Sequence, residues 1–214
     1  RVKSSKNIHG FSFMSQDEEK ASENPLMAMI DEETGNRYMR AVGKKGLGEG
    51  NERDWLIKDM HEELKSWGHP GGQNNELILK SDGEPAIVAV RERLSRYHGG
   101  KITPEQPPKG ESSSNGKVEE AGKTVREFAR VLKEQLEDKT GISLATKNDV
   151  VLWLAKWAAI MCSRYLVGKD GRTAYERRRG RNCRIPTATF GEKVWSKQIR
   201  DGKEREINSI VNGK

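Results

Sequence analysis

The chain has 214 residues, enough for one substantial domain with an appendage or for two small domains. Apolar and charged residues each make up 33% of it, which predicts a globular core with polar surfaces. The sequence contains no apolar run long enough to span a membrane, and its start lacks a signal-peptide pattern. The first residue is Arg1 rather than Met, which is typical of a fragment. The two cysteines and four histidines lack zinc-binding spacing, so a reducing, intracellular setting is the default.

The formal net charge of +7 is distributed unevenly along the chain. Residues 121–214 hold 21 Lys and Arg against 11 Asp and Glu, whereas residues 1–120 hold 18 basic and 21 acidic side chains. A basic C-terminal part in a chain with a pI near 9.4 predicts an acidic partner, and nucleic acid is the most common one. An uneven surface that is merely solvated is the alternative.

Short apolar segments near the N-terminus and in the middle of the chain have the length of β-strands. Two of them flank a turn that contains Gly35 and Asn36, a pattern that predicts a hairpin. The predicted strands are residues 8–14, 26–30, 37–42, 76–80 and 101–103.

Longer segments carry apolar residues at helical spacing. Glycines and prolines separate these segments, and residues 104–116 are predicted to form an irregular loop. An arginine cluster and a strand-like segment at 189–199 follow the last helix. The predicted helices are residues 51–67, 85–97, 117–138 and 149–166.

The order of these elements predicts the fold class. A strand meander followed by alternating strands and helices indicates an α/β fold with a mixed five-stranded sheet flanked by helices. This order is that of the ribonuclease-H-like fold. We predict a core at residues 6–167 and a basic C-terminal extension at 168–214 that leads into a further, truncated segment.

Two acids stand where a metal site for phosphoryl transfer would need them. Asp82 follows the strand at 76–80, and Glu119 lies in the first turn of the helix at 117–138. Acids brought together from several elements can hold two Mg²⁺ ions roughly 3.5–4 Å apart for in-line phosphoryl transfer. Each acid also has a structural interpretation, Asp82 as a helix cap and Glu119 as a complement to the helix dipole. Their joint occurrence in this strand order favours the metal site.

The segments around both acids carry motifs of a known family. LKSDGEPAIVAV at 79–90 is similar to a strand that ends in Ser-Asp before a helix, and SSSNGKVEEAGKTVREF at 112–128 contains Asn-Gly-x-x-Glu. In these motifs the chain resembles the integrase catalytic core of retroviruses and, more closely, of copia-type long-terminal-repeat retrotransposons. DGRTAYERRRGR at 170–181 and FGEKV at 190–194 resemble the segment that follows the core in copia-type elements. The resemblance covers roughly residues 6–200.

The resemblance implies metal-dependent 3′-end processing and strand transfer, the two steps of DNA integration. Asp82 and Glu119 would be catalytic ligands of Mg²⁺ or Mn²⁺. The implied partners are DNA, both the ends of the element and the target, a second copy of the chain, and other polyprotein segments such as reverse transcriptase, with no membrane partner. The implied location is the nucleus or a cytoplasmic virus-like particle.

One position departs from the family pattern. The family's first acid lies in its first strand, in a pattern such as Asp-Tyr/Phe-x-Phe-Met, and the matching segment here is His9-Gly10-Phe11-Ser12-Phe13-Met14. Gly10 has no side chain that could bind a metal, so no carboxylate stands at the third ligand position. We therefore expect the metal site to be weakened or lost and the catalytic activity to be impaired.

Basic residues follow Glu119 along one helical stripe, at Lys123, Arg126, Arg130 and Lys133. In the integrase family that the chain resembles, residues matching Lys123 and Arg126 contact the terminal DNA of the element. Contacts to phosphates give affinity without reading the DNA sequence. A solvated helix face balanced by neighbouring glutamates is the alternative.

Further candidate residues lie in the extension and the loop. Arg177, Arg178 and Arg179 belong to a basic cluster that would contact DNA, with a nuclear-import signal or a solvated linker as alternatives. Gly116 would be a hinge where the loop closes over DNA, or an ordinary glycine at a helix start. His61 and His69 are expected at the surface rather than as ligands.

Two other functions remain open from the sequence. A non-catalytic nucleic-acid-binding or assembly module that retains the integrase scaffold is favoured by Gly10. Another ribonuclease-H-like nuclease would require additional acids near the first strand, and none is evident there.

Overall fold

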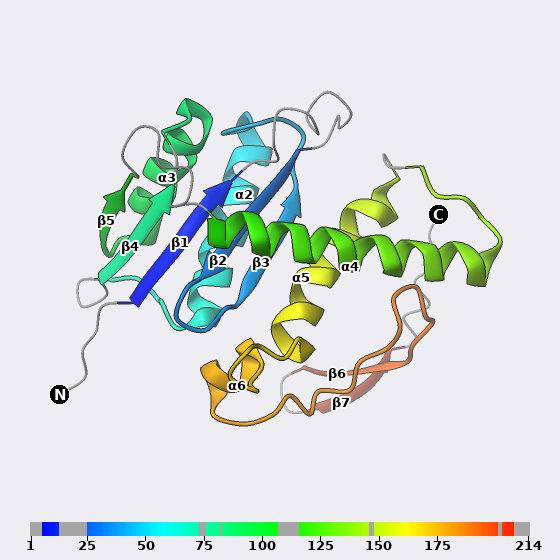
Figure 1. The fold of residues 1–214 in the computed structure, drawn as a ribbon. Coiled ribbons are helices and arrows are strands. Elements are labelled where there is room, and N and C mark those ends of the chain that lie inside the picture. Colours follow the sequence, from blue (N-terminus) through cyan, green and yellow to red (C-terminus); the bar gives the residue numbers. More distant parts are fainter. Residues whose placement is uncertain are drawn as a thin grey trace.

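A mixed sheet with helices on both faces forms the centre of the structure, which is a computed structural model (Figure 1). It describes residues 6–12, 25–72, 76–81, 83–106, 116–145, 148–200 and 203–207, with backbone alone for the first and the last two strands. The strand order is β3-β2-β1-β4-β5. These strands are β1 Lys6–Ser12, β2 Leu26–Asp31, β3 Arg37–Ala41, β4 Glu76–Ser81 and β5 Lys101–Glu105. The predicted α/β class is confirmed.

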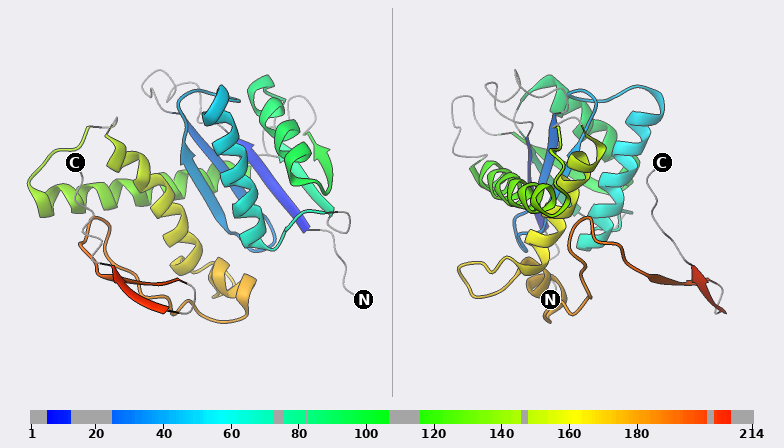
Figure 2. Two further views of the ribbon diagram at one scale, coloured as in Figure 1. Left: turned by 180° about the vertical axis from the view of Figure 1, so that it is seen from behind. Right: turned by 90° about the vertical axis from the view of Figure 1, so that its right-hand side faces the viewer.

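Helices separate into two layers because successive residues of a strand point to opposite faces of a sheet. Met27 and Met29 of β2 belong to the core under α2 and α3, whereas Ala28 and Ile30 belong to the core under α4 and α5. Figure 2 shows both layers from behind and from the side. The helices are α2 Gly50–Trp67, α3 Pro85–His98, α4 Gly116–Thr140, α5 Asp149–Tyr165 and α6 Ala174–Arg179.

The strand directions give the sheet two distinct ends. β1 is parallel to β4 and antiparallel to β2, so β1 and β4 end at the same edge, which we call the site end. The β2–β3 turn lies at the opposite edge. Helices α2 and α3 lead into the parallel strands β4 and β5, so their C-terminal ends lie at that opposite edge as well. The short helix α6 docks there, and we call it the arm end.

The C-terminal extension differs from its prediction. The predicted arginine cluster contains a helix, α6, which Thr173 and Glu176 close with a reciprocal capping box. The strand-like interpretation of 189–199 was wrong for 189–195, because Gly191 has a φ of 76° and the Phe190 ring lies 6.2 Å from the Trp157 ring. Only β6 Ser196–Arg200 is extended there, and it pairs with β7 Lys203–Ile207 in a separate sheet.

The other predicted elements are present with shifted ends. Strand β1 begins two residues earlier than expected, and residues 13 and 14 lie outside the described part of the chain. The surface position expected for His69 was wrong, because its side chain is 2% exposed. No helix within the described residues combines the length and apolar character needed to cross a membrane.

Candidate metal site and nucleic-acid interface

Gly10 occupies an irregular position in β1, next to the end of β4. His9 pairs with Lys80 and Phe11 with Ser81, so β1 uses one more residue than β4 at this point. The pairing with β2 shifts in the same region, between His9 and Ser12. This extra residue has the pattern of a β-bulge, and bulges recur near functional sites, where they redirect the strand. Gly10, which the sequence resemblance matches to the family's first acid, therefore lies at a local distortion and carries no side chain.

The end of β4 is fixed by a buried contact from α3. Nη1 of Arg91 donates a hydrogen bond to Oγ of Ser81 at 3.0 Å, and both residues are buried. A buried guanidinium is stabilised only when it is hydrogen-bonded, so this contact ties the strand end to the helix layer. Asp82 follows Ser81 directly but lies outside the described residues, so its position relative to Glu119 stays a prediction.

Glu119 is exposed in the first turn of α4, and none of the described residues gives it a hydrogen bond or ion pair. The backbone around it is held from both sides. Val118 and Ala121 are buried against the sheet, and Nζ of Lys117 lies 2.9 Å from Oε1 of Glu32 in the β2–β3 turn. The Glu119 carboxylate is thus exposed on a helix turn whose backbone is held in place.

A three-carboxylate metal site does not fit the described residues. No three His, Cys, Asp or Glu side chains in that part of the chain are placed to share an ion. Gly10 offers no oxygen ligand from a side chain, so water would have to take the place of a carboxylate at that position. Glu119 is the one predicted carboxylate ligand among the described residues, so no metal-dependent step follows from them.

The residues of the predicted basic stripe differ in exposure and in their contacts. Lys123 and Arg130 are exposed, and Nζ of Lys123 lies 3.9 Å from Oε1 of Glu127. Arg126 is half-buried beside Gly122. Lys123 and Arg130 therefore place two exposed cations on the first part of α4.

Lys133 has a structural role instead. Its Nζ donates to Oε1 of Glu137 at 2.8 Å, and the same carboxyl accepts from the backbone N–H of Leu144. Bonding to Lys133, and then to Leu144, lowers the pKa of Glu137. Lys133 therefore helps to hold the connection between α4 and α5.

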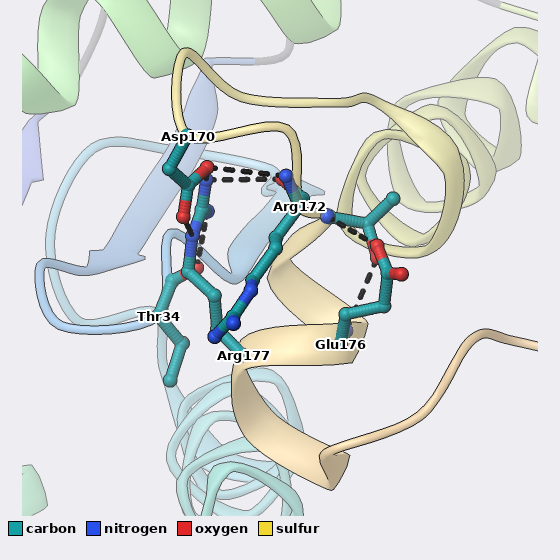
Figure 3. Close-up of polar contacts among 6 residues, drawn as sticks. Thr34, Asp170, Arg172, Glu176 and Arg177 are labelled. Carbon is teal, nitrogen blue, oxygen red and sulfur yellow. Dashed lines mark hydrogen bonds and ion pairs between the residues drawn. The ribbon is translucent and has the colours of Figure 1, made fainter.

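Arg177 is bound within the protein (Figure 3). Its Nε donates to Oδ2 of Asp170 at 2.9 Å, its Nη1 to the carbonyl oxygen of Thr34 at 2.8 Å, and its Nη2 to the carbonyl oxygen of Arg172 at 3.0 Å. The hydrogen bonds from Arg177 hold the pKa of Asp170 far below its usual range. A Cβ at Gly168 would lie 2.1 Å from Nη2 of Arg177, so glycine leaves room for the guanidinium.

The other two predicted DNA-binding arginines of α6 differ from one another. Nη2 of Arg178 donates to the carbonyl oxygen of Ser66 at the end of α2, at 3.1 Å, and the side chain lies against Gly68. Arg179 is exposed. DNA contact by these residues stays a prediction, and the structure assigns Arg177 and Arg178 contacts that dock α6.

Gly116 begins α4, and a Cβ there would meet no atom within 4 Å. The backbone φ of Gly116 is not positive, so the backbone conformation does not require glycine at this position. The hinge role stays a prediction, because the preceding residues 107–115 lie outside the described part.

Comparison with known proteins identifies the fold. Neither a protein-family model nor a curated protein sequence matches the chain. The catalytic core domain of BIV integrase aligns with 80% of this chain and 92% of its own, at 15% identity and a TM-score of 0.51. The HTLV-2 integrase catalytic core domain in complex with magnesium aligns with 81% of this chain and 95% of its own, at 12% identity and a TM-score of 0.52. The fold is that of retroviral integrase catalytic cores.

A longer structure shares the same fold. A chain of the simian T-cell lymphotropic virus intasome, solved in complex with a PP2A regulatory subunit, aligns with 90% of this chain at 14% identity and a TM-score of 0.53. This chain spans 60% of that longer chain.

Sequence reasoning missed Arg91 and the docking role of α6. A signal for Arg91 was present, because it falls on the same helical stripe as Ile87 and Leu94, a face that the apolar spacing marks as buried. A signal for α6 was present in Thr173 and Glu176, which have the spacing of a capping box.

Proposed function

We propose that this chain is the core of a retrotransposon integrase that binds DNA, and that Gly10 impairs its metal-dependent 3′-end processing and strand transfer. The observation that carries the proposal is the integrase fold with glycine at the bulge of β1, beside the end of β4. The copia-type assignment rests on the motifs at 79–90 and 112–128 together with the segments at 170–181 and 190–194. DNA ends, target DNA, a second copy of the chain and other polyprotein segments are its proposed partners.

DNA would lie along the first part of α4. Lys123 and Arg130 are exposed there, Arg126 lies between them along the helix, and the nearby Glu119 is exposed as well. Lysine and arginine bind phosphates without reading bases, and each phosphate contact steepens the dependence of affinity on salt. The proposed interface is therefore a sequence-independent duplex surface.

The first test measures binding of a labelled duplex by fluorescence anisotropy at several salt concentrations. We expect the Lys123→Glu, Arg126→Glu variant to weaken binding at low salt at least about tenfold and to lower the salt slope by about 2, because two phosphate contacts are lost. The matched control is Lys58→Glu, Arg96→Glu, which makes the same charge change on α2 and α3, across the sheet. If both variants lost the same affinity for the duplex, the effect would come from net charge alone, and the proposed interface would be contradicted.

The second test addresses the metal site by thermal shift with Mg²⁺ and Mn²⁺. We expect the metal ions to raise the melting temperature of the natural chain only slightly. They should raise that of the Gly10→Asp variant clearly, because the substitution adds the missing carboxylate. The increase should disappear in Gly10→Asp, Asp82→Asn. Strand transfer by the natural chain at the level of Gly10→Asp would refute the impairment.

A non-catalytic nucleic-acid-binding or assembly module is the second candidate, and Gly10 is the observation that favours it. The two candidates differ in the outcome of the metal titration. DNA binding with no metal response in either the natural chain or Gly10→Asp favours the module.

A further inference from the structure

A cavity of about 600 Å³ opens between α6 and the extended segment that follows it. Its lining contains two arginines, an amide, an aromatic ring and an apolar side chain, and no acid. Within the described residues, neither arginine has an ion pair or hydrogen bond. The lining residues are Tyr175, Arg181, Asn182, Arg184 and Ile185.

Both walls of this cavity are held in place by the protein. Helix α6 is fixed by its capping box and by the docking of Arg177 and Arg178. The opposite wall is held by the hydroxyl of Tyr165, which donates to the carbonyl oxygen of Ile185 at 3.2 Å and lies 2.7 Å from Oγ1 of Thr187. A site with fixed walls loses little conformational entropy when a ligand binds.

We propose that this cavity binds a nucleotide unit of a single-stranded nucleic acid, with phosphate on Arg181 and Arg184 and the base against Tyr175. A guanidinium matches a phosphate with two parallel hydrogen bonds. Unpaired bases stack on aromatic rings, and an amide such as that of Asn182 donates to and accepts from base edges. An acidic peptide would use the two arginines but would have no need of the ring.

The cavity is distinct from the proposed duplex surface. It lies between α6 and the segment that follows it, whereas the duplex surface is the first part of α4. Bases paired in a duplex are already stacked and cannot reach Tyr175. The inference therefore holds or fails separately from the proposed function.

The test measures anisotropy of a labelled oligo(dT) single strand with the full chain. We expect Arg181→Ala, Arg184→Ala to weaken binding at least about tenfold and to lower the salt slope by about 0.7, because the two arginines hold one phosphate of the single strand. Tyr175→Ala should weaken binding several-fold, because it removes the stacking surface, while Tyr175→Phe should retain it. Thermal unfolding of each variant shows that it remains folded.

The matched control is Lys169→Ala, Arg172→Ala, which removes two exposed cations from the turn before α6 and should leave affinity within about twofold. Equal losses in the control and in Arg181→Ala, Arg184→Ala would overturn the site, as would binding of a labelled oligo-glutamate peptide as tight as that of oligo(dT). Lys123→Glu, Arg126→Glu should retain oligo(dT) binding, which separates this site from the duplex surface.

Discussion

The two ends of the sheet are built in different ways. At the arm end, Arg177 and Arg178 dock α6 onto the β2–β3 turn and the end of α2, and Gly35 and Gly168 leave space for the guanidinium of Arg177. At the site end, β1 carries a bulge at Gly10, and β4 ends at Ser81, which accepts a hydrogen bond from the buried Arg91.

The contacts that dock α6, as far as the structure describes them, involve neither Gly10 nor Glu119. The docking of α6 therefore does not depend on these two positions. A carboxylate that serves only a metal adds repulsion and no packing, and its loss therefore costs the fold little. Binding surfaces can persist on such a scaffold after its chemistry weakens.

The largest effect is expected at Arg177. Replacing it with alanine removes hydrogen bonds to Thr34, Asp170 and Arg172, and bonds from a charged donor contribute more than neutral ones. We expect the free energy of unfolding to fall by about 2–3 kcal/mol in urea denaturation. Arg177→Lys keeps the charge but loses the planar fork, so its loss should be smaller but clear.

A double-mutant cycle with Gly168 isolates the packing part of this contact. Gly168→Ala places a Cβ within 2.1 Å of the guanidinium and should destabilise the natural chain by about 1–3 kcal/mol. The same substitution in the Arg177→Ala background should be nearly neutral, because the guanidinium is gone. If the effects of the two substitutions were additive, the docking of α6 would not depend on the space that Gly168 leaves for the guanidinium of Arg177.

The second effect concerns histidines at the arm end. Nδ1 of His98 lies 3.1 Å from Nδ1 of His61, and Nε2 of His98 is buried without a hydrogen-bond partner among the described residues. Burial, and then the neighbouring charges of His61 and His69, lowers the pKa of His98 from 6.5 to about 4. The folded state therefore binds fewer protons than the unfolded state between these two values, and stability is lost as the pH falls through that window.

Comparison with His98→Gln measures this loss. Between pH 7.5 and pH 5, the natural chain should lose about 2 kcal/mol more stability than the variant, because its unfolded state gains a proton that the folded state excludes. The groups that face His98 are His61 and His69, and no acid is among the causes of the shift. If the stability of the two proteins changed with pH in parallel, His98 would not be the cause of the loss.

Much of this arrangement follows from the sequence by simple physical rules. Alternating residues of β2 and the helical spacing of α2 through α5 predict the two helix layers, because they depend on local periodicity. The basic residues of α4 are also predicted by spacing along one helix. The sequence does not show which of them are engaged, because Lys133 meets Glu137 and Leu144 only once the connection to α5 has formed.

The arm end could not be predicted in the same way. Arg177 and Thr34 are 143 positions apart, and no local pattern indicates that a guanidinium will meet that carbonyl oxygen. A cluster of arginines in a basic segment fits nucleic acid and internal docking equally well, since both use the same donors. His69 was likewise expected at the surface, because no local pattern indicates that it is buried and close enough to His98 to lower the pKa of that residue.

The smallest effect is expected at the site end, from Ser81→Ala. This change removes the hydroxyl that accepts from Arg91, and it should cost about 1 kcal/mol of unfolding free energy because the guanidinium is buried. Ser95→Ala is the matched control on α3, since its hydroxyl donates only to a helix carbonyl oxygen and its loss should cost under about 0.5 kcal/mol. A loss at Ser81 as large as that at Arg177 would show that the site end is anchored as strongly as the arm end, and the contrast between the two ends would fail.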